Sequence, residues 1–204
     1  RRLNYRPSAS AASLATGKAR AIGHVVTFGD HMMVNPHFTD FLAGAGEVYA
    51  RFGYEMLLRL APAGGEEDVY RDMISRGRVD GVVVHGPLTD DPRIPFLRSL
   101  GIPFVVHGRC GEDPAGYSWI DVNNRRAFMR ACDFLMDLGH RRIALINGIE
   151  RMNFADRRRQ GYEAALMARG IRPDPAIMFS EDMVEPYGYR AAMEVLTGRD
   201  PASA

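Results

Sequence analysis

The chain has 204 residues, of which 46% are hydrophobic and 25% are charged, and its formal net charge at pH 7 is +1. These values are typical of soluble globular proteins and exclude an intrinsically disordered chain, which combines low hydrophobicity with high net charge. No apolar run approaches about 18 residues, so no segment is predicted to span a membrane. Two cysteines, Cys110 and Cys132, are too few for a disulfide framework, and we predict free thiols.

Positive charge is concentrated at the beginning of the chain. Residues 1–29 contain no acidic residue, and their five basic residues are Arg1, Arg2, Arg6, Lys18 and Arg20. The remaining 21 basic and 25 acidic residues give the rest of the chain a net charge of −4. A basic arm on a mildly acidic body is typical of an arm that contacts a polyanion, although a solvated tail has the same composition.

After the basic arm, short apolar runs alternate with amphipathic segments. The apolar runs are predicted strands, and they occupy residues 22–27, 54–60, 79–85 and 103–107. Helices are predicted where apolar residues recur three and four positions apart, or where residues typical of helix ends, such as proline and glycine, flank the segment. These segments are 36–52, 66–76 and 94–100. Continuous apolar strands that are joined by helices indicate a parallel sheet with both faces covered.

The same alternation starts again near residue 120. It comprises an extended piece at 119–122, helices at 124–138, 155–169 and 187–197, and strands at 142–147 and 176–180. Two strands make a poor sheet, and the chain stops where another strand is due. We therefore predict an α/β fold with a linker at residues 1–20, a first lobe at 21–118 and an incomplete second lobe at 119–204, within a longer polypeptide.

The sequence contains none of the common motifs for catalysis, metal binding or nucleotide binding. It has no CxxC, HExxH, GxxxxGK[ST] or GxSxG, and its nearest glycine-rich match, Gly44-Ala45-Gly46, lies inside a predicted helix. We therefore predict no catalytic residue, no metal and no cofactor. His85 and His107 each end a buried strand, at the edge where parallel sheets bind ligands, and we interpret them as structural or ligand-contact residues.

Several short motifs follow one another in the order typical of one family. They are Leu3-Asn4-Tyr5-Arg6-Pro7, Ala12-Ser13-Leu14-Ala15-Thr16-Gly17, Ile22-Gly23, Asn35-Pro36, Val79-Asp80-Gly81-Val82, Leu138-Gly139-His140, Arg158 with Gly161-Tyr162, and Gly188-Tyr189. This series resembles the LacI/GalR-type bacterial transcription regulators, in which a hinge joins a helix-turn-helix headpiece to a sugar-binding body.

The resemblance implies two Rossmann-like lobes of the periplasmic-binding-protein type, with a small sugar-like effector between them. It also implies a headpiece before Arg1 and further strands after Ala204. In the hinge, Leu14 matches a leucine that enters the DNA minor groove, and we expect Arg6 and Lys18 to contact phosphates. The resemblance also implies a homodimer, because a palindromic operator requires two-fold symmetry in the protein that binds it. The location that the resemblance implies is the bacterial cytoplasm.

The resemblance also names residues for the effector. They are His37, Phe38, His85 and Arg109, followed by Asn123, Arg158 and Met183. Arg158 matches the ligand-binding arginine of the family, and its guanidinium suits vicinal hydroxyls or a carboxylate. A surface ion pair within Arg157-Arg158-Arg159 is the alternative for Arg158, and a place in the core is the alternative for Phe38.

Three departures from the family pattern affect the ligand. Asn123-Asn124 stands where the family has an Asp-Asn pair, Met183 stands where several relatives have a ligand-stacking aromatic residue, and the loop between residues 27 and 35 is longer than expected. Methionine is adaptable but has no flat face for a sugar ring. These changes favour a neutral sugar or oligosaccharide over a purine.

Two other functions fit the same fold class. A periplasmic or transport-linked sugar-binding protein would have a signal peptide before Arg1, and the basic arm argues against it. An α/β enzyme would need a phosphate loop or a nucleophile, and the sequence shows neither. A DNA-binding regulator, in particular a repressor, is therefore the preferred interpretation.

Overall fold

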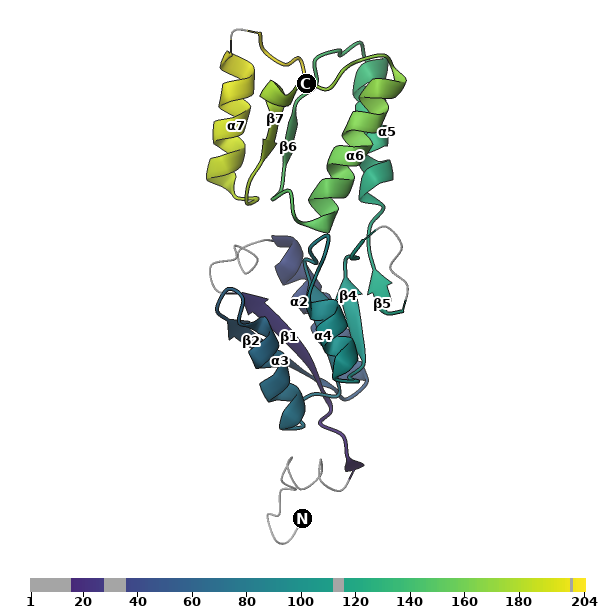
Figure 1. The fold of residues 1–204 in the computed structure, drawn as a ribbon, viewed down its shortest axis with the longest axis vertical. Coiled ribbons are helices and arrows are strands. Elements are labelled where there is room, and N and C mark those ends of the chain that lie inside the picture. The colour runs from purple at the N-terminus through teal and green to yellow at the C-terminus, as the bar shows by residue number, and fades with distance from the viewer. Residues whose placement is uncertain (1–15, 28–35, 112–115, 199) are drawn as a thin grey trace. The chain divides into compact units, whose positions relative to one another are not determined.

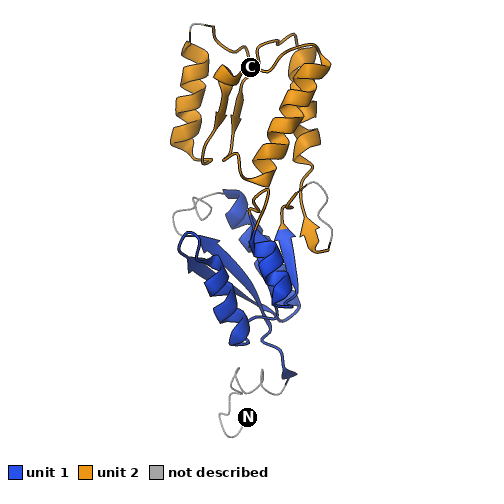
Figure 2. Ribbon diagram, in the orientation of Figure 1, with its two compact units in different colours: residues 1–85, 92–106 blue, residues 86–91, 107–204 orange. Residues whose placement is uncertain are grey.

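The structure, a computed structural model, describes residues 16–27, 36–111, 116–198 and 200–204 (Figure 1). The chain divides into two compact units, which have different colours in Figure 2. Unit 1 consists of residues 1–85 and 92–106, and unit 2 consists of residues 86–91 and 107–204. Both units have the α/β class that the sequence predicts, with parallel strands and helices in alternation.

Unit 1 is built on a sheet in which the strand order is β2-β1-β3-β4. Its elements are β1 (Ala21–Thr27), α2 (Pro36–Arg51), β2 (Glu55–Ala61), α3 (Glu66–Ser75), β3 (Gly81–His85), α4 (Arg93–Ser99) and β4 (Phe104–His107). β1 pairs in parallel with both β2 and β3, which places β1 inside the sheet. Its burial on both faces explains why its residues form an apolar run without alternation.

Local signals in the sequence explain the ends of the unit 1 helices. Proline is favoured in the first turn of a helix, and α2 begins at Pro36. After α2 the chain turns at Gly53, whose φ of +69° is costly for any residue with a Cβ. The first turn of α3 carries three acidic residues, which favour the positive end of the helix dipole.

Unit 2 contains a two-stranded parallel sheet of β6 and β7. Its elements are β5 (Ser118–Ile120), α5 (Asn124–Asp137), β6 (Leu145–Asn147), α6 (Asn153–Ala168), the 3₁₀ turn η2 (Pro175–Ile177), β7 (Met178–Ser180) and α7 (Glu185–Thr197). In Figure 1, α5 and α6 lie side by side on one side of these strands, and α7 lies on the other. The main core cluster joins α5, α6 and β6 through Met136, Leu166 and Leu145.

The strands of unit 2 are shorter than the sequence predicts. Strand β6 starts at Leu145 rather than Arg142, and the backbone before it bonds the end of the chain: the Ala144 N–H donates to the Ala204 carbonyl at 2.7 Å, and the Arg142 carbonyl accepts from the Ser203 N–H at 2.8 Å. Strand β7 starts at Met178 rather than Ala176, because residues 175–177 form a 3₁₀ turn in which the Ala176 N–H donates to Asp174 Oδ1 and the Ile177 N–H to the Asp174 carbonyl.

The division into units differs from the predicted boundary between residues 118 and 119. Segment 86–91 belongs to unit 2 because its backbone bonds to the start of α6. The Thr89 N–H donates to the Arg151 carbonyl, and the Asn153 N–H donates to the Pro87 carbonyl. Sequence periodicity detects strands and helices, but it does not show which loop packs on which lobe.

Both cysteines are free thiols, as the sequence predicts. Burial raises the pKa of the Cys132 thiol to about 11, so it is protonated and unreactive at neutral pH. Across the described ranges, no helix has both the length and the apolar character that crossing a membrane requires. The same residues contain no group of three or more His, Cys, Asp or Glu side chains arranged to hold a metal ion.

Candidate functional site

Unit 1 contains a buried histidine pair at the carboxyl end of its sheet. His24 of β1 and His85 of β3 are 0% and 2% exposed, and His24 Nδ1 lies 2.9 Å from His85 Nε2. The hydroxyl of Tyr49, on α2, lies 3.2 Å from the other ring nitrogen of His24. Three polar side chains therefore form a hydrogen-bonded chain inside an otherwise apolar core.

Two phenylalanines of α2 enclose this histidine pair. The rings of Phe38 and Phe41 meet the ring of His85 edge to face, with centroids 5.1 and 4.9 Å away. Phe38 is 5% exposed, whereas its neighbour His37 is exposed in the first turn of α2. The structure thus brings the predicted residues Phe38 and His85 together in a closed cluster, which we call the histidine cluster: His24, Phe38, Phe41, Tyr49 and His85.

Burial keeps His24 of the histidine cluster neutral at physiological pH. It lowers the pKa of His24 from 6.5 to about 4, because the interior disfavours the imidazolium ion. A neutral imidazole has one donor and one acceptor nitrogen, so His24 can complete both of its hydrogen bonds without carrying a charge. This arrangement satisfies buried polar groups and fixes the end of β3 against β1.

Unit 2 contains a second cluster, centred on the guanidinium of Arg158 on α6. Arg158 Nε donates to Asn124 Oδ1 at 2.9 Å, and Arg158 Nη1 lies 3.8 Å from the sulfur of Met183. The guanidinium carbon lies 4.8 Å from the ring centroid of Phe154 and 5.3 Å from that of Phe128. We call these five residues the Arg158 cluster. Two cation–π contacts and one hydrogen bond fix the orientation of the guanidinium.

A chain of polar contacts extends from the Arg158 cluster towards Arg109. The amide of Asn124 lies 3.4 Å from one oxygen of Asp121, and Arg109 Nε lies 3.1 Å from the other. Arg109 therefore compensates the charge of Asp121. Among the described residues, the direct contacts of Arg158 are all with neutral groups. Burial lowers the pKa of Arg158, and the charge of Asp121 opposes that shift.

Two glycines allow these side chains to approach each other. A Cβ at Gly161 would overlap the carbonyl oxygen of Arg125, so α5 and α6 cross there at their closest possible distance. Arg158 lies almost one turn before Gly161, and this crossing places it beside Asn124 in the first turn of α5. A Cβ at Gly148 would lie 2.9 Å from the ring of Phe154, so glycine makes room for that ring.

The predicted ligand residue Asn123 has another role in the structure. Its side-chain oxygen accepts a hydrogen bond from the Arg126 N–H at 3.0 Å, which caps the start of α5. The next residue, Asn124, is 6% exposed and bonds Arg158 instead. Asn124 is thus the member of the pair that contacts Arg158, and the ligand contact of Asn123 stays a prediction. A buried polar residue directly after an N-cap was the available signal.

The predicted DNA contacts fall mostly outside the described part of the chain. Arg6 and Leu14 lie in residues 1–15, and the long loop at 28–35 is likewise outside the described residues. Lys18 is described and exposed, and its backbone N–H donates to the Thr16 hydroxyl at 3.4 Å. His107, at the end of β4, is also exposed.

The run Arg157-Arg158-Arg159 divides into three different environments. Arg159 is paired with carboxylates, and its guanidinium lies 2.8 Å from Asp156 and 3.3 Å from Glu163. Arg157 is 8% exposed. A surface ion pair was the alternative to ligand binding for Arg158. The structure shows such ion pairs at Arg159, whereas Arg158 has the neutral partners given above.

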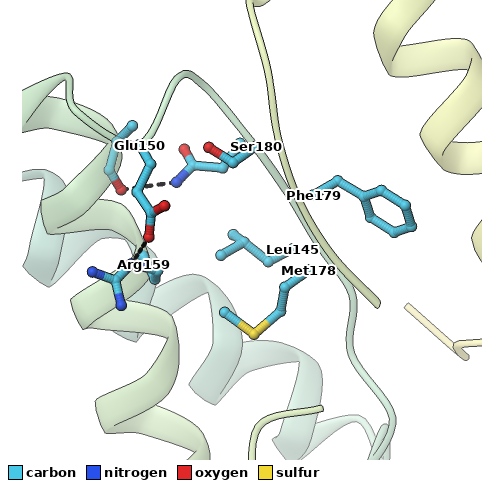
Figure 3. A pocket seen from close by; sticks show the side chains of 8 residues that line it. Leu145, Glu150, Arg159, Met178, Phe179 and Ser180 are labelled. Carbon is cyan, nitrogen blue, oxygen red and sulfur yellow. Dashed lines mark hydrogen bonds and ion pairs between the residues drawn. The ribbon is translucent and has the colours of Figure 1, made fainter. Parts of the chain in front are cut away.

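A cavity of about 150 Å³ lies between α6 and the strands β6 and β7 (Figure 3). Its lining consists of Leu145, Asn147, Glu150, Ala155, Arg159, Met178, Phe179 and Ser180. Arg159 and Glu150 lie side by side in Figure 3, with Nε and Oε1 3.5 Å apart. None of the predicted ligand residues lines this cavity, which is separate from the Arg158 cluster.

Two α/β units, each with parallel strands and helices in alternation, have the architecture of periplasmic-binding-protein-like domains. Residues 20–203 match the family described as periplasmic binding proteins and sugar binding domain of the LacI family. The chain belongs to this family.

Similar proteins are transcription regulators. The chain is 39% identical over 204 residues to the HTH-type transcriptional regulator AglR of Rhizobium meliloti (strain 1021), covering 100% of this chain and 57% of that protein. It is 32% identical over 209 residues to the HTH-type transcriptional regulator RafR of Escherichia coli, covering 100% and 60%. The chain thus spans 57% to 60% of the length of these relatives.

The solved structure of the transcriptional regulator CelR in complex with cellobiose is also similar. It has a TM-score of 0.77 and 27% sequence identity, and the match covers 92% of this chain and 60% of that chain. At this identity the match supports the family assignment as well as the fold.

Proposed function

We propose that the whole protein is a transcription regulator, in particular a repressor, whose affinity for operator DNA changes when a neutral saccharide binds at the Arg158 cluster. The observation that carries this proposal is the orientation of Arg158 by neutral partners alone. Because no carboxylate of the described residues is bonded directly to it, the guanidinium keeps N–H donors for ligand oxygens. The cellobiose complex of CelR supports a saccharide as the ligand class.

The chemistry of the cluster suits a sugar hydroxyl face. A guanidinium presents a rigid fork of donors that can bind two neighbouring hydroxyl oxygens. Phe154 and the half-exposed Met183 offer apolar surface for the C–H groups of a pyranose ring. Asn124, being neutral, orients Arg158 without cancelling its charge. In unit 1, we assign Phe38 and His85 a packing role beneath the exposed His37.

The DNA side of the proposal rests on the basic arm and on the relatives. Arg6, Leu14 and Lys18 are the residues that we assign to operator contacts, within a segment that carries no acidic residue. AglR and RafR are helix-turn-helix regulators by name. We accordingly propose operator DNA as a partner, a homodimer as the binding form, the bacterial cytoplasm as the location and no catalytic reaction.

The complete native protein provides the test. Thermal shift against a panel of neutral mono- and disaccharides, cellobiose included, identifies the strongest ligand, because specific binding stabilises the folded state. Calorimetry with Arg158→Ala should then show at least a 100-fold weaker Kd, about 3 kcal/mol. Arg159→Ala removes the same charge one residue away and should change the Kd less than threefold. Equal losses in both variants, or none in Arg158→Ala, would remove Arg158 from the site.

A further inference from the structure

The cavity between α6 and the strands β6 and β7 is lined by two residues with unsatisfied polar atoms (Figure 3). Asn147, which ends β6, is 5% exposed, and its buried Oδ1 accepts no hydrogen bond from any described residue. Arg159 Nε is also buried without a hydrogen bond, since Glu150 Oε1 lies 3.5 Å away, beyond the usual hydrogen-bond range. Buried polar atoms are nearly always hydrogen-bonded, so this pair indicates a site that another molecule completes.

The hydrogen bonds around these two atoms fix which one accepts and which one donates. Asn147 Nδ2 donates to the carbonyl of Ala155 at 2.8 Å, and a carbonyl only accepts. The orientation of this amide is therefore fixed, and Oδ1 is its remaining acceptor. The terminal nitrogens of Arg159 donate to Asp156 at 2.8 Å and to Glu163 at 3.3 Å, whereas Nε has no such bond. The lining of the cavity thus offers one buried acceptor and one buried donor.

A hydroxyl group is the ligand chemistry that suits both of these atoms. A neutral O–H donates to Asn147 Oδ1, while its oxygen accepts from Arg159 Nε. An ammonium group has no acceptor for Nε and would add a positive charge beside the guanidinium. A carboxylate has no donor for Asn147, and it would meet the three carboxylates that already lie around Arg159. The polar end of the ligand is therefore an uncharged alcohol.

The apolar part of the lining determines the size and character of the rest of the ligand. Leu145 and Ala155 are buried and Met178 is half-buried, and all three line the cavity. Its volume of about 150 Å³ is similar to that of an engineered apolar cavity that binds benzene, and it is roughly ten times the room that one water needs. The thioether of Met178 favours an aromatic ring. A saccharide, with hydroxyls on all sides, would leave several of them unpaired against this lining.

We propose that this cavity is a second ligand site of unit 2, which takes a small, neutral aromatic alcohol. The hydroxyl of the ligand bonds Asn147 Oδ1 and Arg159 Nε, and its ring packs on the apolar lining. This inference goes beyond the proposed function and does not rest on it, because the cavity lining shares no residue with the Arg158 cluster.

The test titrates the complete native protein with phenol, which combines a benzene ring with one hydroxyl. The carbon-13 NMR signals of the Met178 and Met183 methyl groups, assigned by replacing each methionine with leucine, report on the cavity and on the Arg158 cluster. Phenol should shift the Met178 signal saturably, with a Kd of about 1 mM or tighter, and leave the Met183 signal in place. Anisole, in which a methyl group replaces the hydroxyl hydrogen, cannot donate to Asn147 and should bind at least tenfold more weakly.

Substitutions on α6 test the apolar and the polar part of the site separately. Ala155→Leu fills the cavity without removing a polar group and should weaken phenol binding at least tenfold. Ala168→Leu makes the same change at an exposed position of the same helix and should change the Kd less than twofold. Arg159→Met keeps an unbranched side chain but removes the donor, and it should weaken phenol binding at least fivefold. If Ala155→Leu does not fold, Arg159→Met and the comparison of phenol with anisole provide the test.

Several results would overturn the proposal, each for its own reason. A Met178 signal that phenol does not shift would mean that the cavity holds water only. A Met183 signal that shifts with the same Kd would place phenol at the Arg158 cluster instead. Equal Kd values for phenol and anisole, or an unchanged Kd in Arg159→Met, would remove the hydroxyl contacts. An unchanged Kd in folded Ala155→Leu would place the bound ring outside the cavity.

Discussion

The two polar clusters of the molecule use similar residues in opposite ways. In unit 1, aromatic rings enclose a histidine pair that is almost fully buried, and burial lowers the pKa of His24 to about 4. In unit 2, aromatic rings flank a guanidinium that remains half-buried and next to the half-exposed Met183. The first cluster satisfies its own hydrogen bonds, whereas in the second the partners of the guanidinium among the described residues are one amide, one sulfur and two rings, and we propose that its other N–H groups bind a ligand. Rings around a polar group therefore indicate a binding site only where that group keeps unused donors and exposure.

The difference has a structural origin. The histidine cluster is formed by strand residues, His24 and His85, covered by one helix. The Arg158 cluster is formed chiefly by two helices that cross closely at Gly161. Strand residues of a sheet covered on both faces are buried, but residues in the first turns of crossing helices can stay near solvent.

The largest expected effect concerns the helix crossing in unit 2. Gly161→Ala places a Cβ on the carbonyl of Arg125 and should lower the free energy of unfolding by about 4 kcal/mol, above the usual cost of overpacking. Urea unfolding followed by circular dichroism measures it. Saccharide affinity should fall about tenfold, because Arg158 moves away from Asn124.

Gly188 provides the matched control for this variant. It lies inside α7, and nothing lies within 4 Å of a Cβ built there. Gly188→Ala should therefore raise the free energy of unfolding by about 0.5 to 1 kcal/mol, because alanine is the better helix former. If Gly161→Ala and Gly188→Ala changed the free energy of unfolding and the saccharide affinity equally, the close crossing would not explain the position of Arg158.

The next largest effect is a loss of stability at low pH, caused by the buried, neutral imidazole of His24. The folded state lowers the pKa of His24 from 6.5 to about 4, so the unfolded chain takes up the proton first as pH falls. Stability should be complete above pH 6.5 and decline towards pH 4, with about 2 kcal/mol lost by pH 5. Urea unfolding at pH 7, 6 and 5 measures this decline.

A variant that cannot titrate isolates the contribution of His24. His24→Gln keeps a donor and an acceptor, and its stability should fall less steeply over the same pH range. An identical decline in both proteins would show that other groups cause it. Saccharide affinity at pH 7 should be the same in both, because the cluster is a packing element.

The smallest expected effect is on the free energy of unfolding and concerns Tyr49, at the end of the hydrogen-bonded chain in the histidine cluster. Tyr49→Phe removes the hydroxyl that lies 3.2 Å from His24 Nε2 and should cost about 1 kcal/mol of unfolding free energy. Tyr54→Phe, one residue before β2, provides a control for removing a tyrosine hydroxyl and should be nearly neutral. A loss of saccharide binding in Tyr49→Phe would contradict the contrast between the two clusters.

Periodicity and end signals in the sequence were sufficient to predict the elements of the fold. The strands and helices occur in the predicted order, and α2 begins at the predicted Pro36. The length of β6 was not predictable in this way, because residues distant in sequence, Ser203 and Ala204, bond the backbone groups of Arg142 and Ala144.

The site was predictable only in part. Arg158 followed from its spacing to Gly161, and the structure now gives that spacing a reason in the helix crossing. Asn124 was missed because both members of an asparagine pair have the same chemistry, and only the position of the helix start decides which one is the cap.

The chain contains a single tryptophan, Trp119, and its surroundings give it a practical consequence. The guanidinium of Arg109 lies 5.5 Å from its ring centroid, and Arg109 is ion-paired with Asp121, which contacts the asparagine that holds Arg158. Indole emission depends on nearby charge, so an event at Arg158 reaches this fluorophore through three side chains. We therefore expect the emission of Trp119 to change when a ligand binds at Arg158, which a fluorescence titration without an attached dye would detect.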